Sequence, residues 1–514
     1  MIEEAPAETV SPGGGLDLVL ADESATVALA VSLAAVLGPG DMITLSGDLG
    51  AGKTTFARAL IRHLAGDESL EVPSPTFTLM QIYDLPGGPV AHADLYRVQA
   101  ADELVEMGFD DLGRDAIVLV EWPDRAAGHL PADRLDIEFS LTADQGVGRR
   151  RARITGHGAM AGRAARMAAI GQFIAEAGFA EAKRVRLKGD ASTRAYERLT
   201  LPQRRVVLMN APRRPDGPPV RNGLPYSALV HLAEDVKPFV ALARGLRERG
   251  FSAPEIHAAD IDAGLLILED FGDDPVVAGD PPLPIEDRYT AAVDVLVALH
   301  QEALPDVLPV APRIEHRLAR YDVDALMIEA DLLLDWYLPH RGTAPSPEVR
   351  AEFAELWRKA LQITLLAAPT WVLRDYHSPN LMWLPRRDGN ARVGLLDFQD
   401  AVTGPAAYDV VSLLQDARVD VPESIEVGLI GRYVKARRAR DRTFDLNTFF
   451  ELYAVMGAQR ATKVLGIFSR LDKRDGKPQY LRHQPRVWRN LRRSLSHPAL
   501  RSLKAWYDKH ASAP

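Results

Sequence analysis

The stretch DMITLSGDLGAGKTTFARALIRHL, residues 41–64, decides the fold of the first part of the chain. An apolar strand candidate, MITLS, leads into a glycine-rich turn, GDLGAGKT, and a helix candidate follows at once. The turn matches the phosphate-binding pattern G-x-x-x-x-G-K-[ST], and a strand before it and a helix after it are the context that this pattern requires. We therefore expect a nucleotide-binding loop in an α/β domain.

Each residue type in this turn has a task in phosphate binding. Glycines let backbone N–H groups approach the phosphates because no Cβ stands in the way. The lysine, Lys53, reaches the outer phosphates, and the hydroxyl of Thr54 holds Mg²⁺. The residues expected to bind the nucleotide are Gly47, Gly50, Gly52, Lys53, Thr54 and Thr55. The turn thus predicts ATP and Mg²⁺ as ligands.

The segments around this turn predict the extent of its domain. Strand candidates LDLVL, IVLVEW and RLDIEFSL alternate with helical patterns over residues 16–155, as in a parallel-sheet α/β domain. Residues 1–15 end in SPGGG and are expected to form a flexible tail. Residues 156–166 are rich in glycine, alanine and arginine and are expected to form a linker.

Composition limits the class of protein. At 514 residues the chain is long enough for two or three domains. Its formal net charge of −9 argues against bulk electrostatic binding of nucleic acid, and the absence of cysteine excludes disulfides and cysteine nucleophiles. The apolar run from Ala25 to Leu37 is shorter than the ~20 residues that span a bilayer, so a cytoplasmic protein without membrane contact is expected.

The second part of the chain changes character. A helix candidate and the strand candidates RVRLKG, AYERLTL, RVVLMNA and GLLILEDFG come first, and mostly helical patterns follow. This order predicts a small strand-rich lobe over residues 167–275 and a larger helical lobe over residues 276–514. The whole region, 167–514, is thus expected to be a two-lobed α+β domain.

A second nucleotide site is indicated by WVLRDYHSPNLMWL, residues 371–384. Phosphoryl transfer needs the phosphates held, metal ions placed and the acceptor hydroxyl positioned, with little covalent help from the protein. Asp375 is the candidate base, and Asn380 and Asp397 are the candidate Mg²⁺ ligands. The turn in LKGDASTRAYERL, with Gly189 and Ser192, is the candidate phosphate flap. Together these residues, in this order, predict kinase-type chemistry.

The first domain resembles the TsaE family, the small ATPase of bacterial threonylcarbamoyladenosine modification of tRNA. GDLGAGKTT, PSPTF, DLYR and EW carry the resemblance over almost the whole domain. It implies that Thr76 belongs to a nucleotide-sensitive switch and that Asp94 and Glu121 are needed for hydrolysis. Glu121 also follows a buried strand, where an acid suits Mg²⁺ binding. The resemblance implies TsaD and TsaB type partners and, through them, tRNA.

The second domain resembles the aminoglycoside phosphotransferase superfamily, and within it the AmgK-type kinases of N-acetylmuramate and N-acetylglucosamine. GDASTRAYERL, LLILEDFGD, RDYHSPNLMWL and GLLDFQDAVTGPAAYDVVSLLQDAR carry the resemblance. It implies an anomeric sugar hydroxyl as the acceptor, Asp375 as its base, and an adenine pocket that includes Glu269 and Asp270. Asp409, at a helix start, is expected to brace the catalytic loop.

Two departures from the family pattern stand out. Leu373 occupies a position where many relatives have a histidine, so a hydrogen bond that steadies the loop must be absent or replaced. The strand VVLMNAP lacks the phosphate-pairing lysine of protein kinases.

Three hypotheses of function therefore stand. The first is a fusion of an ATPase for tRNA modification with an amino-sugar kinase of peptidoglycan recycling. In the second, the kinase-like part is a weakly active nucleotide sensor. In the third, this part phosphorylates an aminoglycoside or a choline-like acceptor. The intact set of Asp375, Asn380 and Asp397 favours an enzyme.

Overall fold

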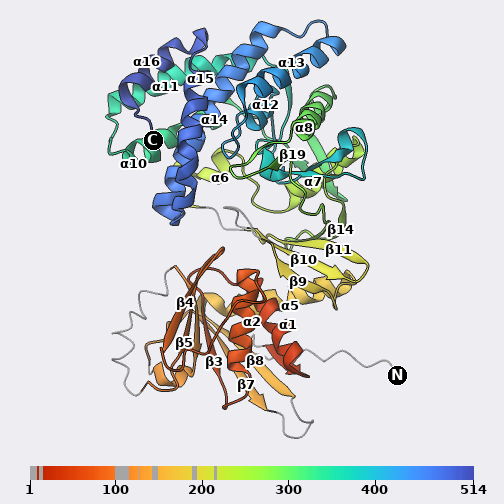
Figure 1. The fold of residues 1–514 in the computed structure, drawn as a ribbon, viewed down its shortest axis with the longest axis vertical. Coiled ribbons are helices and arrows are strands. Elements are labelled where there is room, and N and C mark those ends of the chain that lie inside the picture. Colours follow the sequence, from red (N-terminus) through yellow and green to blue (C-terminus); the bar gives the residue numbers. More distant parts are fainter. Residues whose placement is uncertain are drawn as a thin grey trace. The chain divides into compact units, whose positions relative to one another are not determined.

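A computed structural model describes residues 9–10, 16–98, 115–126, 128–141, 149–187, 194–213 and 217–514. The chain divides into two compact units, shown in Figure 1. Unit 1 holds residues 1–212 and 257–270, and unit 2 holds residues 213–256 and 271–514. The predicted flap residues Gly189 and Ser192 lie outside the described residues, as does the predicted tail apart from Thr9–Val10.

Unit 1 contains a large mixed sheet. Its described strands are β1 (Thr9–Val10), β2 (Leu16–Leu20), β3 (Met42–Ser46), β4 (Met80–Leu85), β5 (Gly88–Asp94), β6 (Ile117–Glu121), β7 (Arg134–Leu141) and β8 (Arg150–His157). They lie in the order β1-β2-β8-β7-β3-β6-β5-β4. The parallel sheet expected from the sequence is confined to β7, β3, β6 and β5. The outer strands are antiparallel, because short connections such as that between β4 and β5 make hairpins.

Two helices, α1 (Glu23–Ala34) and α2 (Lys53–Ala65), cover one face of this sheet (Figure 1). Side chains of a strand alternate between faces, so Ile43 and Leu45 pack beneath the helices and Thr44 points to the other face. Helix α2 begins directly after Gly52, whose φ of 112° is costly for any residue with a Cβ. The strand, loop and helix predicted from residues 41–64 are confirmed.

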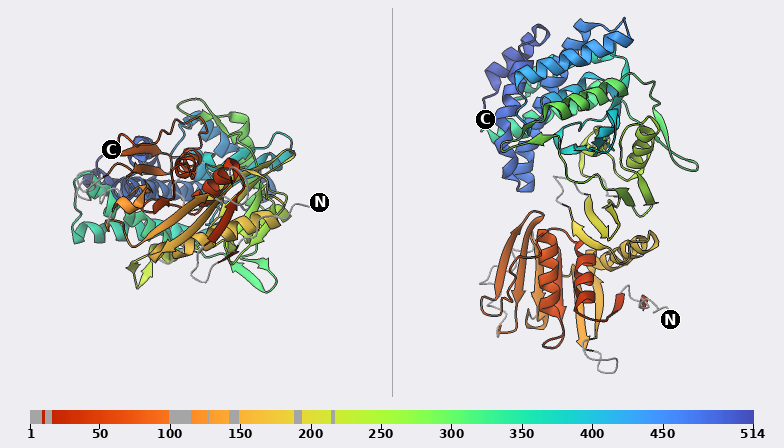
Figure 2. Two further views of the ribbon diagram at one scale, coloured as in Figure 1. Left: turned by 90° about the horizontal axis from the view of Figure 1, so that it is seen from below. Right: turned by 45° about the vertical axis from the view of Figure 1, so that its right-hand side comes forward.

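A smaller sheet belongs to the same compact unit. Its strands are β9 (Lys183–Arg186), β10 (Ala195–Leu201), β11 (Arg204–Asn210), β14 (Ile256–Asp260) and β15 (Leu265–Glu269), in the order β14-β15-β11-β10-β9. Helix α5 (Ala161–Glu176) lies beside this sheet and also contacts α1 and β8 (Figure 1 and Figure 2). One apolar core includes Leu33 of α1, Ile170 of α5 and Leu208 of β11. The phosphate-loop sheet and the small sheet therefore share a core.

The residues expected to form a linker, 156–166, are ordered secondary structure instead. They comprise the end of β8, the 3-10 turn Gly158–Met160 and the start of α5. Strand β8 buries Ala152 and Ile154, while Arg151 and Arg153 face outward. Its apolar positions are few because only one face of the strand is buried, and the low apolar content around it is the reason for the expected linker.

The described part of unit 2 consists mostly of helices (Figure 1). They are α6 (Tyr226–Leu229), α7 (Lys237–Glu248), α8 (Glu286–Leu299), α9 (Val323–Leu332), α10 (Leu338–His340), α11 (Pro347–Leu361), α12 (Ala407–Leu414), α13 (Glu423–Arg440), α14 (Leu446–Asp475), α15 (Gln484–Ser494) and α16 (Arg501–His510). Helix α14 contacts α9, α12 and α15. None of the helices in the described part of the chain has the length and apolar character that a membrane crossing needs.

Short antiparallel strand pairs complete unit 2. They are β12 (Pro219–Arg221) with β13 (Leu224–Pro225), β16 (Val277–Ala278) with β17 (Leu283–Pro284), β18 (Val307–Ala311) with β19 (Ile314–Arg317), β20 (Pro369–Val372) with β23 (Val402–Pro405), and β21 (Leu381–Trp383) with β22 (Val393–Leu395). Strand β20 leads directly into the loop that carries Asp375, and β22 ends just before Asp397. These two strand ends therefore position the second candidate site.

Candidate active sites

The phosphate loop of unit 1 holds its lysine in a defined place. Lys53 Nζ donates hydrogen bonds to the carbonyl oxygens of Gly47 at 2.7 Å and Asp48 at 2.9 Å. It also lies 3.8 Å from the ring centroid of Trp122, in a cation–π contact. Burial lowers the pKa of Lys53, although the nearby carboxylates of Glu121 and Asp94 oppose this. The lysine thus stays close to the turn that is expected to receive phosphates.

Glu121 links the loop to the neighbouring strands. Its Oε2 accepts a hydrogen bond from Thr54 Oγ1 at 2.9 Å, and its Oε1 lies 2.9 Å from Nε2 of the buried His92. The two predicted Mg²⁺ ligands of this site are therefore in direct contact. A hydroxyl and a carboxylate are oxygen ligands of the kind that Mg²⁺ prefers, so the pair fits the cation.

Asp94 lies next to Glu121, because the two residues are register partners at the ends of the parallel strands β5 and β6. Its Oδ2 accepts hydrogen bonds from Thr76 Oγ1 at 2.8 Å and Ser74 Oγ at 3.0 Å, and its Oδ1 accepts from the Tyr96 amide. The segment that contains Thr76 is thus tied to the end of the sheet through one carboxylate. All the predicted residues of this site lie together.

The second candidate site lies on two neighbouring loops of unit 2. Asn380 Nδ2 donates to the backbone oxygen of Asp375 at 2.9 Å and lies 3.5 Å from Asp397 Oδ2. Gln399 Nε2 donates to Asp397 Oδ1 at 2.8 Å. Since the amide nitrogen of Asn380 faces the Asp375 carbonyl, its amide oxygen is left to bind a cation. The donor set of Asn380 and Asp397 fits Mg²⁺, which commonly takes few protein ligands and keeps several waters.

The Asp375 carboxylate, 38% exposed, lies close to His377 and is influenced by Lys463 and Arg460. Burial works to raise its pKa, but the interaction with His377 and the charges of Lys463 and Arg460 outweigh burial and hold the pKa below the usual range. Asp375 is therefore ionised at neutral pH. This is the form that can accept a proton from a hydroxyl group.

Asp409 braces the loop from the start of α12. Its carboxylate oxygens accept hydrogen bonds from the backbone amides of Leu373 at 2.6 Å and Arg374 at 3.0 Å. The Leu373 side chain itself is buried. The interpretation of Asp409 as a structural residue is confirmed, and the loop is held without a histidine at position 373.

The segment expected to line an adenine pocket ends strand β15 in unit 1. The carboxylate of Asp270 accepts from Arg198 Nε at 2.6 Å and from Arg205 Nε at 2.7 Å. Since two arginines engage this carboxylate, a contact with adenine at this position would use the backbone of Glu269 and Asp270.

Comparison with known proteins divides the chain at a different place from the two compact units, because the second family match begins within unit 1. Residues 183–444 match the phosphotransferase enzyme family. The N-acetylmuramate/N-acetylglucosamine kinase of Caulobacter vibrioides is 41% identical over 358 residues, which cover 67% of this chain and 96% of that protein. This chain belongs to the phosphotransferase enzyme family.

The first part of this phosphotransferase chain matches a different family. Residues 20–152 match the threonylcarbamoyl adenosine biosynthesis protein TsaE. The TsaE of Rickettsia felis is 42% identical over 107 residues, which cover 21% of this chain and 62% of that protein. The crystal structure of Bacillus subtilis YdiB matches at 28% identity, with a TM-score of 0.25, over 33% of this chain and 96% of that one. The two family matches show a TsaE domain before the phosphotransferase domain. The strands and helices of the structure agree with both predicted fold classes.

Two buried residues at these sites were given no role from the sequence. In the TsaE domain, His92 is fully buried against Glu121. It begins the candidate stretch HADLYR, two residues before Asp94, but was given no role of its own. In the phosphotransferase domain, Glu329 of α9 is fully buried and pairs with Arg374 and with Lys463. Glu329 lies outside any motif, so the pattern around Asp375 gave no indication of it.

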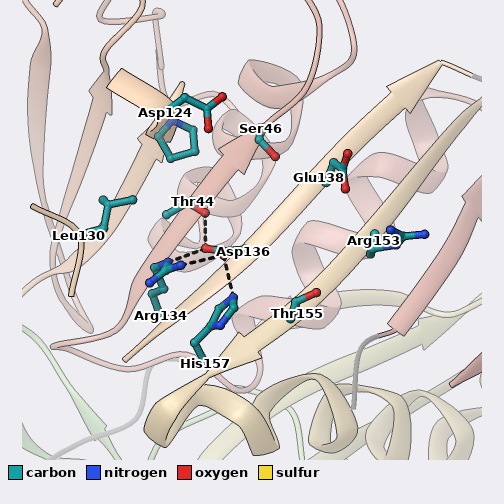
Figure 3. A pocket seen from close by; sticks show the side chains of 11 residues that line it. Thr44, Ser46, Asp124, Leu130, Arg134, Asp136, Glu138, Arg153, Thr155 and His157 are labelled. Atoms are coloured by element: carbon teal, nitrogen blue, oxygen red, sulfur yellow. Dashed lines mark hydrogen bonds and ion pairs between the residues drawn. The ribbon is translucent and has the colours of Figure 1, made fainter. Parts of the chain in front are cut away.

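The TsaE domain also contains a polar cavity of about 370 Å³ on the sheet face opposite α1 and α2 (Figure 3). It is lined by Thr44, Ser46, Pro123, Asp124, Leu130, Arg134, Asp136, Glu138, Arg153, Thr155 and His157. Figure 3 shows Asp136 at the centre, bonded to Thr44 at 2.7 Å, Arg134 at 2.9 Å and His157 at 2.7 Å. Residues predicted to bind ATP or Mg²⁺ are absent from this lining. The cavity is therefore distinct from the nucleotide loop.

Proposed function

We propose that this chain combines two ATP-dependent activities. The TsaE domain hydrolyses ATP in support of threonylcarbamoyladenosine modification of tRNA, together with TsaD and TsaB type partners. The phosphotransferase domain transfers a phosphoryl group from ATP to the anomeric hydroxyl of N-acetylmuramate or N-acetylglucosamine in peptidoglycan recycling. Both proposed activities use cytoplasmic substrates.

The observation that carries the kinase proposal is the arrangement of Asp375, Asn380 and Asp397. The ionised Asp375 is exposed enough to accept the proton of a sugar hydroxyl as its oxygen attacks phosphorus. Asn380 and Asp397 would hold Mg²⁺, which neutralises phosphate charge when bound. The amino-sugar acceptor is proposed from the Caulobacter vibrioides relative, whose match covers nearly the whole of that kinase.

The contact between Thr54 and Glu121 supports the ATPase proposal. The hydroxyl and carboxylate would hold Mg²⁺ beside the phosphates, and Lys53 would leave its two carbonyl partners to bind the outer phosphates. Asp94 holds Thr76, so the segment around Thr76 is the part of the domain suited to sense whether phosphate is present. Hydrolysis at this site would drive the partner assembly.

An acceptor panel tests the kinase proposal. The full chain carrying Lys53→Ala, which silences the first site, is incubated with ATP, Mg²⁺ and one acceptor: N-acetylmuramate, N-acetylglucosamine, kanamycin or choline. We expect ADP release to rise with the two sugars and to return to background when Asp375→Asn is added. A response to kanamycin or choline alone would assign another acceptor. If no acceptor raises ADP release and Asp375→Asn leaves the background rate unchanged, the kinase proposal fails and the nucleotide-sensor hypothesis stands.

A further inference from the structure

Arg374, the residue before the candidate base, has an unusual backbone conformation. Its φ is 65°, and the amide of Asp375 donates to the carbonyl oxygen of Leu373 at 2.8 Å, which closes a three-residue γ-turn. A γ-turn with positive φ is rare and strained, and a left-handed conformation costs an L-residue about 1–2 kcal/mol. The orientation of Asp375 therefore depends on the strained backbone of Arg374, which neighbouring residues must stabilise.

The buried side chain of Arg374 provides one such support. Its Nη2 pairs with Oε1 of Glu329, and its Nη1 donates to the Val230 carbonyl oxygen at 2.7 Å. Glu329, which is fully buried, also pairs with Lys463 Nζ at 2.8 Å and accepts a hydrogen bond from the Tyr321 hydroxyl. One carboxylate on α9 thus joins the catalytic loop to α14.

The backbone of the same residue is held from another direction. The Arg374 carbonyl oxygen accepts from Ser412 Oγ at 3.0 Å, and Ser412 Oγ in turn accepts from Arg460 Nε at 3.0 Å. Its amide donates to Asp409. Residues of α12 therefore hold the backbone of Arg374, and Glu329 of α9 holds its side chain. Of these supports, the ion pair with Glu329 and the hydrogen bond to the Val230 carbonyl oxygen use the arginine side chain, and the ion pair is the one that joins it to a charged partner.

We propose that Glu329 is a positioning residue for phosphoryl transfer, which acts by anchoring Arg374 in the γ-turn that aims the Asp375 carboxylate. This inference rests on the proposed role of Asp375 as the base. Removal of Glu329 would leave Arg374 and Lys463 as two buried cations without their shared carboxylate, and such charges are costly to keep in place. The γ-turn would then relax, and the Asp375 carboxylate would no longer point toward the acceptor hydroxyl.

Kinetics of two variants of the full chain test this inference. Arg374→Gly removes the side chain that pairs with Glu329, and glycine adopts positive φ without strain, so a loss of activity is not caused by strain at residue 374. We expect kcat for sugar phosphate formation to fall about 100-fold, because a misplacement near 1 Å costs that much, while KM for ATP changes less than about threefold. Glu329→Gln should act in the same direction, and Glu329→Asp, which keeps the charge, should retain more activity than Glu329→Gln.

The matched control is Asp324→Asn. Asp324 also lies on α9 and pairs with Arg358 at 3.2 Å, but both side chains are exposed. Its kcat should stay within about twofold of the parent, because exposed ion pairs contribute little. If Arg374→Gly keeps the parent kcat, the inference is overturned. If Glu329→Gln fails to fold, Arg374→Gly still decides the question, because it leaves Glu329 paired with Lys463.

Amide hydrogen exchange separates this inference from the proposed function. In both variants the amides of residues 373–375 should exchange faster than in the parent, with the remaining core unchanged. Unchanged exchange at these amides overturns the inference even if the chain phosphorylates no sugar. A parent chain that forms no sugar phosphate overturns the proposed function instead, and the exchange result then decides the positioning role by itself.

Discussion

The carboxylate of Asp409 accepts a hydrogen bond from the backbone amide of Leu373 at 2.6 Å. The loop that carries the candidate base is thus fastened through its backbone. The Leu373 side chain, only 2% exposed, fills an apolar position. The sequence left open whether the hydrogen bond of the usual histidine is absent or replaced, and the structure shows a hydrogen bond to this loop that uses no side chain of residue 373.

Asp409→Asn should lower kcat of sugar phosphorylation about tenfold or more, because one of two buried amides loses its acceptor and such a loss costs about 1–3 kcal/mol. KM for ATP should change little. Leu373→Met, which keeps the apolar volume, serves as the control and should stay within about twofold of the parent. Steady-state kinetics with N-acetylmuramate checks both. An equal loss of kcat in Asp409→Asn and Leu373→Met would mean that the side chain of residue 373 matters as much as the hydrogen bonds from Asp409.

Motifs predicted the residues that we propose to bind nucleotide, but they did not predict the buried residues that hold those side chains in place. Lys53 and Thr54 follow from one spacing pattern, and Glu121 follows from its place after a buried strand, because ends of neighbouring parallel strands meet at one edge. The partners His92 and Glu329 lie at positions to which no motif assigned a role, on elements that also carry other acids. Their roles depend on long-range packing, which a spacing pattern does not contain.

Glu121→Gln should separate nucleotide binding from hydrolysis in the TsaE domain. Lys53 and the glycine turn remain, so affinity for a fluorescent ATP analogue should change less than about threefold. Phosphate release should fall roughly 100-fold, as expected when an acid–base or metal-binding carboxylate is removed. The measurement uses the full chain with Asp375→Asn, which removes phosphate transfer at the second site.

The control for this variant is Glu138→Gln, since Glu138 is an exposed acid of the same sheet, outside the nucleotide loop. It should release phosphate at the parent rate. Hydrolysis that persists in Glu121→Gln would exclude the assigned role of Glu121.

His300 should make the stability of the phosphotransferase domain depend on pH. Burial lowers its pKa to about 3, and its Nδ1 lies 2.9 Å from the Tyr433 hydroxyl. Between pH 3 and the ordinary value near 6.5, the unfolded chain therefore binds more protons than the folded chain, so stability falls as pH is lowered through this window. From pH 7 to pH 4.5 the loss from this group is roughly 2–3 kcal/mol.

Urea denaturation of the parent and His300→Gln at the two pH values checks this prediction. The parent should lose more stability than the variant on acidification, because glutamine has no proton to gain. An equal loss in both chains would show that His300 is not the source.

Separation of the two domains at the expected linker should destabilise the second piece. In the full chain, Ile170 and Ile174 of α5 belong to the core that also contains Leu33 of α1. A piece that starts at residue 160 keeps α5 but loses α1, and exposure of two isoleucines costs roughly 3–6 kcal/mol. We expect this piece to melt at a lower temperature than the full chain and to self-associate in light scattering.

Addition of a separate piece of residues 1–155 should reverse part of this loss. A monomeric second piece with the melting temperature of the full chain would contradict the shared core. The core was not predicted, because β8 alternates arginine with Ala152 and Ile154 and so resembles a polar linker in composition. The period of two in RRARIT was the signal that identifies it as a strand.

The central claim is that the chain has two independent ATP sites with different products. Mass spectrometry of N-acetylmuramate, incubated with ATP, Mg²⁺ and the full chain, tests it most directly. We predict that the sugar gains one phosphoryl group with the parent and with Lys53→Ala, and that Asp375→Asn lowers this yield roughly 100-fold or more. Formation of no sugar phosphate by the parent, or equal formation by Asp375→Asn, would contradict the account.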